Sequence, residues 1–277
     1  MSTFYRFPNG LHKALTLSYD DGVEQDVRLM DILDKHGIRC TFNLNSGCFA
    51  PEGTTYPAGT IHRRMSQAQV ARVYANPNHE VAAHCLTHAS LTELSPAEIA
   101  HEVLADRENL EAMFGGIVRG LAYPFGTYSV EVAETLKATG VAYARTVGST
   151  NDFSIPTNWL MLHPTCHHNA PNLSALCDRF LNDSAPFGSH LFYLWGHSYE
   201  FESDNNWHVI EDFCEKMGGR DDIWYATNIE IVDYVNACRA IRTSADGKTL
   251  HNPTATCVWA DIDGKSVRIG AGETVRV

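Results

Sequence analysis

The chain has 277 residues, of which 44% are hydrophobic and 19% are charged. This composition supports a large buried core and excludes an intrinsically disordered protein. The formal net charge is −12, whereas a surface that binds phosphates carries the opposite charge. Nucleic acids and anionic membranes are therefore poor partners for this chain.

The hydrophobic segments and the cysteines of the chain indicate the cellular compartment in which it works. No apolar run approaches the ~18 residues that cross a bilayer, and the segment before Leu15 lacks the apolar stretch of a signal peptide. Eight cysteines are scattered without a Cys-x-x-Cys pair, which is typical of free thiols in a reducing compartment. We expect a cytoplasmic protein; a secreted protein whose leader had been removed would present the same N-terminus. The oligomeric state stays open.

Short apolar runs alternate with amphipathic segments along most of the chain. The apolar runs predict strands over residues 15–19, 39–44, 80–83, 119–123, 141–147, 159–163, 190–195 and 223–226. Helical spacing of apolar residues predicts helices over 27–36, 66–74, 96–114, 130–139, 173–181, 209–217 and 229–242. Ser66 and Ser95 are predicted N-caps, and Ser95 forms a capping box with Glu98.

The repeated alternation predicts an α/β fold whose parallel sheet is either closed into a barrel or doubly wound. No glycine-rich phosphate-binding motif follows the first predicted strand, so a nucleotide-binding fold has no support. After about residue 245 the pattern changes to short alternating segments at 255–262, 266–269 and 273–277. We expect residues 1–245 to form the main domain. Residues 246–277 should form a small β appendage packed on it, because about 30 residues cannot build an independent core.

Polar side chains follow the ends of four predicted strands. These clusters are Asp20-Asp21, His84–His88, Tyr123–Gly126 and His197. The active site of an α/β barrel lies at the carboxyl ends of its strands, so we expect the four clusters to share one face.

The pair His84 and His88 has the i,i+4 spacing at which two imidazoles on one helical turn bind the same cation. With 14 histidines in the chain, such a pair also arises between unrelated side chains. Two neutral imidazoles and one carboxylate leave an open position for water, as catalytic zinc sites do.

In this order, the clusters resemble the motifs of polysaccharide deacetylases of the NodB-homology type, carbohydrate esterase family 4. The family's first motif resembles Ser18–Gly22 (SYDDG), and its His-x-x-x-His motif resembles His84–His88 (HCLTH). Its third motif, which ends Pro-aromatic-Gly, is similar to Pro124–Gly126, and its last motif is approximated by Trp195–His197 (WGH). The resemblance extends over about residues 12–240.

The resemblance implies a distorted (β/α)7 barrel and metal-dependent removal of acyl groups, usually N-acetyl groups of a glycan. It implies that Asp21, His84 and His88 bind a divalent metal. Nitrogen and carboxylate ligands suit zinc, with Co²⁺ or Ni²⁺ as alternatives.

The resemblance also implies the residues that handle protons and charge. Asp20 matches the general base, which takes the proton of the attacking water. His197 matches the general acid, which protonates the leaving amine. The backbone N–H of Phe125 matches the donor that stabilises the oxyanion.

One departure from the family pattern concerns the base. The third motif normally has an arginine two residues before its proline, where this chain has Ala122. Arg119 differs from residue 122 in strand parity and faces the other side. Arg145 lies near the end of the next predicted strand, and consecutive strands in this architecture are neighbours. We therefore predict that Arg145 supplies the missing cation and pairs with Asp20; a surface arginine is the alternative.

A second departure concerns the acid. The family's aspartate–tryptophan motif, which supports the acid histidine, has no counterpart that aligns, although Asp152 and Trp159 lie in the right part of the chain.

We expect a metal-dependent hydrolase that removes acetyl groups from an N-acetylated or O-acetylated saccharide. One alternative is an amidohydrolase of small molecules with non-peptide C–N bonds, which the missing leader and free cysteines favour. Another is a catalytically silent glycan-binding protein on the same barrel. The joint presence of two aspartates and three histidines argues against the silent protein, which has no chemical need for them.

Overall fold

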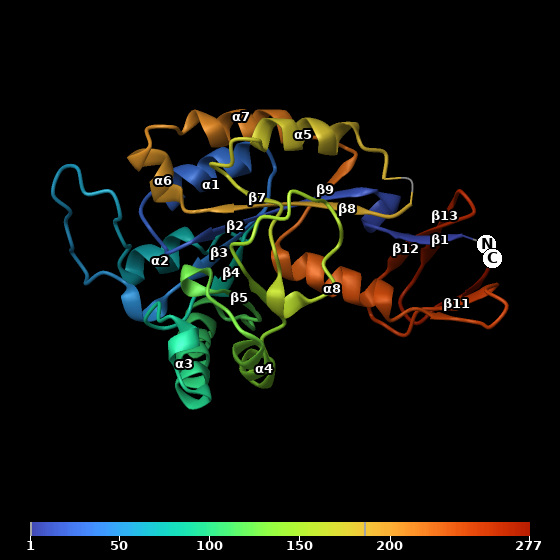
Figure 1. Cartoon of the computed structure of the whole chain (residues 1–277), viewed down its shortest axis with the longest axis horizontal. Helices are drawn as coiled ribbons and strands as arrows, with labels where there is room; N and C mark the ends of the chain where they lie inside the picture. Colours follow the sequence, from blue (N-terminus) through green and yellow to red (C-terminus); the bar gives the residue numbers. More distant parts are fainter. Residues whose placement is uncertain (1, 186) are drawn as a thin grey trace.

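The computed structural model describes residues 2–185 and 187–277. Seven parallel strands form a curled sheet in the order β6-β5-β4-β3-β2-β8-β7 (Figure 1). They are β2 (Lys13–Asp20), β3 (Cys40–Leu44), β4 (Glu80–Ala83), β5 (Gly120–Ala122), β6 (Tyr143–Arg145), β7 (Cys166–His167) and β8 (His190–Gly196). A further strand, β9 (Ile223–Tyr225), pairs with the first residues of β2. The predicted α/β fold, a distorted (β/α)7 barrel, is confirmed.

Helices flank the sheet, with α1, α5, α6 and α7 above it and α3, α4 and α8 below it in Figure 1, and the first residue of α8, Asn228, reaches the inner face of β2. They are α1 (Asp26–Lys35), α2 (Gln67–Val73), α3 (Pro96–Phe114), α4 (Val130–Ala138), α5 (Leu173–Asn182), α6 (Ser198–Ser203), α7 (His208–Met217) and α8 (Asn228–Arg239). The predicted N-caps Ser66 and Ser95 accept hydrogen bonds from the N–H groups of Gln69 and Glu98. Within the described residues, none of these helices combines the length and apolarity needed to cross a membrane.

The two faces of β2 differ: apolar side chains point to one face, and polar side chains point to the other. Leu15, Leu17 and Tyr19 are fully buried in the core that includes residues of α1 and α7. The alternate residues Thr16, Ser18 and Asp20 face the barrel interior, where polar partners satisfy them. Thr16 donates a hydrogen bond to Asn228 Oδ1 at 2.8 Å, and Ser18 accepts one from Asn43 Nδ2 at 2.8 Å. The inner face therefore leads directly to Asp20 at the strand end.

The barrel is open between β6 and β7, which form the two edges of the sheet. The strand predicted over residues 159–163 is wrong over Trp159–Met161, which form a 3-10 helix, η5, whereas Leu162 makes an isolated parallel bridge to Arg145 of β6. Asn158 starts that turn by accepting a hydrogen bond from the N–H of Leu160 at 3.1 Å. Trp159 and Leu162 pack with the cluster that contains residues of α8, and Leu160 packs against the cluster that contains residues of α3 and α4. The strand that follows is the two-residue β7, which the sequence pattern did not reveal.

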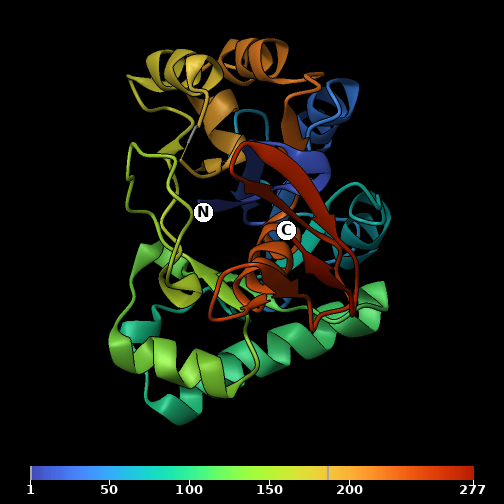
Figure 2. The same ribbon diagram turned by 90° about the vertical axis from the view of Figure 1, so that its right-hand side faces the viewer.

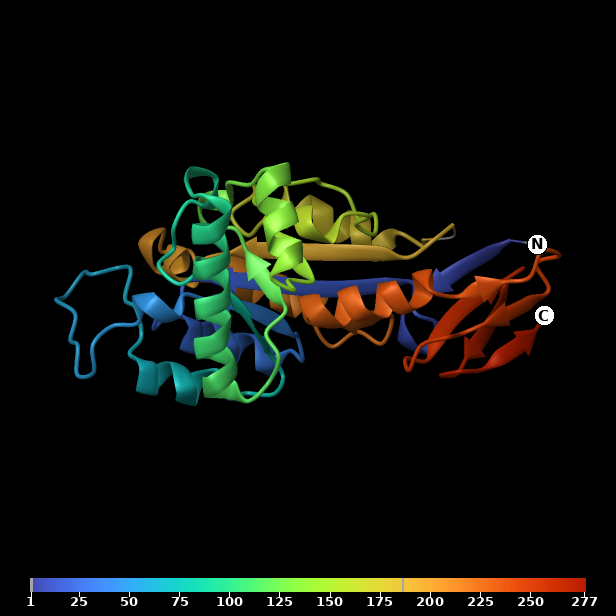
Figure 3. The same cartoon turned by 90° about the horizontal axis from the view of Figure 1, so that it is seen from below.

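The C-terminal appendage consists of two three-stranded sheets at one end of the molecule (Figures 2 and 3). The first contains β10 (Arg242–Thr243), β11 (Thr249–His251) and β14 (Thr274–Arg276), and the second contains β1 (Thr3–Arg6), β12 (Val258–Ile262) and β13 (Lys265–Ile269). The N-terminal strand β1, which the sequence did not predict, pairs antiparallel with β12.

Contacts of α8 join the appendage to the barrel. The hydroxyl of Tyr234 donates a hydrogen bond to the carbonyl of Arg6 at 2.7 Å and accepts one from the N–H of Trp259 at 3.1 Å. Both ends of the chain therefore contribute to the appendage, and a domain division at residue 245 stays a prediction.

Candidate active site

The polar clusters that follow predicted strands meet at one edge of the sheet. Asp20 ends β2 and Asp21 follows it, His84 follows β4, and Arg145 ends β6. His197 follows β8. Because the strands are parallel, their carboxyl ends lie at the same edge, and residues more than a hundred positions apart come into contact.

Asp21, His84 and His88 lie close enough together to bind one cation, with their ligand atoms all within 4.8 Å of one another. Asp21 Oδ1 lies 3.8 Å from Nε2 of His88 and 4.0 Å from Nε2 of His84. The histidines do not share a helical turn, as the spacing suggested. They meet through a tight turn in which Cys85 and His88 have positive φ, and their ring centroids lie 4.8 Å apart.

The protonation states of these three residues suit a divalent cation. Nδ1 of His84 lies 2.8 Å from the carbonyl oxygen of Ala122, to which it donates as the neutral tautomer, so Nε2 keeps its lone pair. Burial lowers the pKa of His84, and burial together with the neighbouring His84 lowers the pKa of His88 to about 4. Burial would raise the pKa of Asp21, but its contacts with His62, His84 and Arg64 lower it. Two neutral imidazoles and one carboxylate result, a donor set that fits zinc and similar ions.

Arg64 and Asn45 connect the loops that carry these candidate ligands, and sequence reasoning missed this role. Arg64 Nη2 lies 2.9 Å from Asp21 Oδ1, and its Nη1 donates to Asn45 Oδ1 at 2.7 Å. Asn45 Nδ2 in turn donates to the carbonyls of His84 and Cys85. His62, from the same segment as Arg64, lies 3.2 Å from Asp21 Oδ2. No sequence pattern connects residues 62–64 to this site, because they lie in an irregular segment between β3 and α2.

Asp20 and Arg145 form the buried ion pair that the sequence led us to expect. Arg145 is fully buried, and its guanidinium lies 4.6 Å from the ring centroid of Trp195. Asn43 Nδ2 donates to the other carboxylate oxygen of Asp20 at 2.8 Å. Burial alone would raise the pKa of Asp20, but the nearby Arg145, His84 and His197 together lower it. Asp20 is therefore ionised at neutral pH, as a general base must be.

His197 lies between two carboxylates. Its Nε2 is 3.7 Å from Asp20 Oδ2, and its Nδ1 is 3.3 Å from Oε1 of Glu200, a residue of α6. Burial would lower the pKa of His197, but the contacts with Glu200 and Asp20 raise it. A histidine with a raised pKa keeps its proton near neutral pH, which suits a general acid.

Glu200 takes the supporting position beside His197 for which Asp152 and Trp159 had been considered. Asp152 Oδ1 accepts from its neighbour's N–H and Oδ2 from the hydroxyl of Ser154. Trp159 Nε1 donates to Asn236 at 2.8 Å. The only sequence signal for Glu200 is its place three residues after His197, at the start of a short helix.

Phe125 borders the candidate metal site. Its backbone has φ 58° and ψ 4°, a left-handed conformation that is rare for an aromatic residue. The ring is 67% exposed, and its centroid lies 4.5 Å from that of His88. Strained backbone of this kind is concentrated at functional sites. Its oxyanion role stays a prediction.

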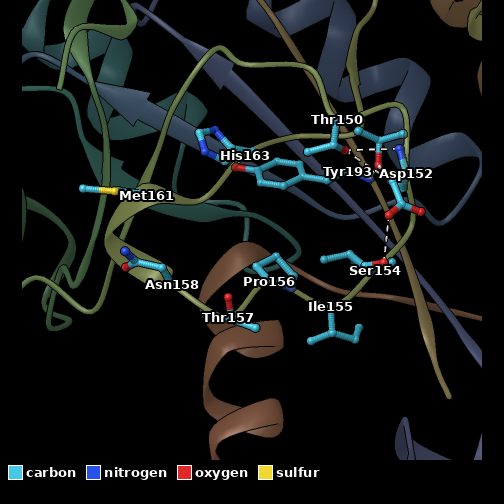
Figure 4. Close-up of a pocket in the computed structure, with 12 residues that line it drawn as sticks. Thr150, Asp152, Ser154, Ile155, Pro156, Thr157, Asn158, Met161, His163 and Tyr193 are labelled. Atoms are coloured by element: carbon cyan, nitrogen blue, oxygen red, sulfur yellow. Dashed lines mark hydrogen bonds between the residues drawn. The ribbon is translucent and has the colours of Figure 1, made fainter. Parts of the chain in front are cut away.

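A cavity of about 440 Å³ lies between the irregular segment 150–165 and β8. In Figure 4, His163 and Tyr193 border one side of it, and Thr157 and Asn158 the other. None of the candidate metal ligands, nor Asp20, Arg145 or His197, lines this cavity. Asp152 does line it.

Comparison with known proteins places the chain in a family. The profile of the polysaccharide deacetylase family matches residues 7–144. A chitooligosaccharide deacetylase of Rhizobium leguminosarum bv. phaseoli is 28% identical over 149 residues, which cover 53% of this chain and 56% of that protein. A protein of the same name from Bradyrhizobium is 29% identical over 133 residues, or 47% and 54% of the two chains. The chain thus spans about half of the length of the curated relatives it matches.

Solved structures support the same fold. A Mycobacterium smegmatis protein, provisionally named a polysaccharide deacetylase, aligns with a TM-score of 0.58 and 17% identity over 84% of this chain and 93% of that one. A family 4 carbohydrate esterase from Streptomyces lividans, in complex with acetate, aligns with a TM-score of 0.52 and 15% identity over 78% and 93%. The profile match, which covers about half of the chain, and the curated relatives assign the chain to the polysaccharide deacetylase family, and the solved structures agree with its fold.

Proposed function

We propose that this protein is a metal-dependent hydrolase that removes acetyl groups from an acetylated saccharide, with N-acetylated chitooligosaccharides as the first substrates to test. The observation that carries the proposal is the arrangement around Asp20. An ionised carboxylate lies 3.7 Å from an imidazole whose pKa is raised, directly beside a set of two imidazoles and one carboxylate that fits a divalent cation. Family membership and the names of the curated relatives support the same activity.

Asp21, His84 and His88 would hold the metal. A divalent cation bound there supplies Lewis-acid polarisation of the acyl oxygen and lowers the pKa of water to about 7. Their neutral imidazoles and ionised carboxylate are ready to bind without first losing a proton. Zinc is the preferred ion on donor type, and Co²⁺ and Ni²⁺ remain alternatives.

Asp20 and His197 divide the proton transfers. Asp20 accepts the proton of the attacking water, while Arg145 and Asn43 hold its carboxylate in place and ionised. The N–H of Phe125 stabilises the negative oxygen that develops on the carbonyl. His197 then donates its Nε2 proton to the leaving amine, which is a poor leaving group until it is protonated. Glu200 positions His197 from the Nδ1 side.

The test is a substrate screen on the purified protein with its metal content measured on the same sample. N-acetylated chitooligosaccharides, acetylxylan and a cyclic ureide are compared, and acetate release and ring opening are quantified. We expect acetate from the chitooligosaccharides, and none from the Asp20→Asn variant. Ring opening of the ureide without acetate release would favour the amidohydrolase, and saccharide binding without turnover would favour a silent glycan-binding protein.

A further inference from the structure

A second group of histidines surrounds a single carboxylate on the acid side of the site. We call it the Glu200 cluster; it contains Glu200, His167, His168 and His197. Nε2 of His167 lies 3.1 Å and Nε2 of His168 lies 3.2 Å from Oε2 of Glu200, and Nδ1 of His197 lies 3.3 Å from Oε1. The proposed reaction needs one carboxylate contact to His197, and it does not account for His167.

Three members of the cluster have the geometry of a cation site. The ligand atoms of His167, His197 and Glu200 all lie within 4.8 Å of one another. Ligands bound to zinc at 2.0–2.1 Å in a tetrahedron are separated by ~3.3 Å. His167 lies 3.1 Å from Oε2 of Glu200 and His197 lies 3.3 Å from Oε1, so each imidazole is at about that separation from one of the two carboxylate oxygens; in the first set the corresponding distances to Asp21 Oδ1 are 3.8 and 4.0 Å.

A second observation points to a ligand at this place. Nδ1 of His197 is buried and makes no hydrogen bond of acceptable geometry within the described part of the chain, although Glu200 lies 3.3 Å away. His168 is fully buried behind Glu200 and contacts the carboxylate from the protein side, as residues that orient metal ligands do. The side chains of His167, His197 and Glu200 are 21–24% exposed, which leaves a path for an ion and a position for water.

We propose that His167, His197 and Glu200 form a second divalent-cation site, weaker than the first, and that zinc bound there inhibits the enzyme. It is weaker because all three of its ligands are partly exposed and must be immobilised on binding, whereas in the first set only His88 is partly exposed and the side chains of His84 and Asp21 are 2% and 8% exposed. The inhibition rests on the proposed function. An imidazole coordinated through Nδ1 cannot hold the second proton that His197 must donate as an acid.

Zinc content at controlled free zinc tests the site without reference to activity. The wild-type protein and the His167→Gln, His84→Gln and His101→Gln variants are dialysed against buffers of rising free zinc. We expect the wild type to bind one zinc at low and two at high concentration. His167→Gln should lose the second zinc only, and His84→Gln the first only. His101→Gln, which removes an exposed histidine of α3, should match the wild type. Anomalous diffraction at the zinc edge should place the second ion beside Glu200.

Rates of acetate release along the same titration test the inhibition. The wild-type rate should fall at least tenfold as the second zinc binds, while the rate of His167→Gln should stay within about twofold of its own starting value. One zinc in the wild type at all concentrations, or two in His167→Gln, would overturn the second site. Two zinc ions in a protein that turns over no saccharide would overturn the proposed function and leave the cation site standing.

Discussion

The candidate metal ligands Asp21, His84 and His88 and the Glu200 cluster combine the same types of side chain, imidazoles and a carboxylate, at the same edge of the barrel, yet they are built differently. Asp21 and His88 have positive φ values of 87° and 59°, and the ligand loops are held by Arg64 and Asn45. The Glu200 cluster lies at the ends of regular elements, β7, β8 and α6, and is partly exposed. Strained backbone is retained only where the surroundings hold it. The comparison indicates a rigid ligand set on one side and an adaptable proton-handling group on the other.

The largest effect should come from removing a ligand of the rigid set. We expect His84→Gln and His88→Gln to lose the tightly bound metal and to lower kcat/KM about a thousandfold or more, roughly 4 kcal/mol of barrier. Metal analysis at low free zinc and initial rates on one saccharide measure the two quantities. Unchanged metal content in both variants would show that the metal lies elsewhere.

Asp20 and Asp21 are adjacent in sequence, and we propose different roles for them, as base and as metal ligand. Asp20→Asn should lower kcat a hundredfold or more and keep the metal, because an amide cannot accept the proton of water. Asp21→Asn should lose the metal as well as activity. The two variants are each other's control. Reversed phenotypes would mean that Asp21 is the base and Asp20 the metal ligand.

A substitution in the Glu200 cluster should change the pH dependence of kcat. Glu200 raises the pKa of His197, so Glu200→Gln should lower that pKa and move the alkaline limb of the kcat profile to lower pH. We expect kcat to fall about thirtyfold, or roughly 2 kcal/mol. Glu202→Gln is the matched control, because Glu202 lies on the same helix but pairs with Arg63 and Gln25. An identical pH profile in Glu200→Gln and wild type would remove Glu200 from the proton transfer.

Arg145 supports the base from the opposite wall of the barrel. Arg145→Lys should lower kcat at least about tenfold, roughly 1.4 kcal/mol, because lysine cannot reproduce the planar guanidinium that both pairs with Asp20 and stacks on Trp195. Metal content and the melting temperature verify that the variant is loaded and folded. Wild-type rates in a folded variant would leave Asp20 without a needed partner.

The smallest effect should come from substituting Arg64, which we expect to influence the affinity for the metal only through its contact with Asp21. Substitution of a residue that contacts a metal ligand typically lowers the metal affinity 10–100-fold. We expect Arg64→Gln to raise the Kd for zinc about tenfold. Arg63→Gln is the control, because Arg63 pairs with Glu24 and Glu202 and contacts no ligand. Equal Kd values in the two variants would show that the Arg64 contact does not position Asp21. Competition with a chelator of known affinity measures both.

The sequence by itself determined most of the order of strands and helices of the barrel, and its resemblance to a known family supplied the candidate ligands Asp21, His84 and His88. Local periodicity reports which face of an element is buried, and parallel strands place their carboxyl ends together whatever the loops contain. The family resemblance implied an arginine partner for Asp20, and the rule that consecutive strands are neighbours was enough to choose Arg145, 125 residues away, for that role.

Only the tertiary structure decided what surrounds these residues. Arg64 and Glu200 lie in an irregular segment and in a six-residue helix, where no periodic pattern ties a side chain to a distant partner. The turn that joins His84 to His88 depends on the left-handed backbone of Cys85 and His88. The i,i+4 spacing of the two histidines suggests a helix and does not reveal this turn. Strand β1 finds its partner β12 more than 250 positions away. Such contacts depend on how the whole chain packs. The free energy that stabilises them comes from burying surface between segments that are distant in sequence and touch only in the folded protein.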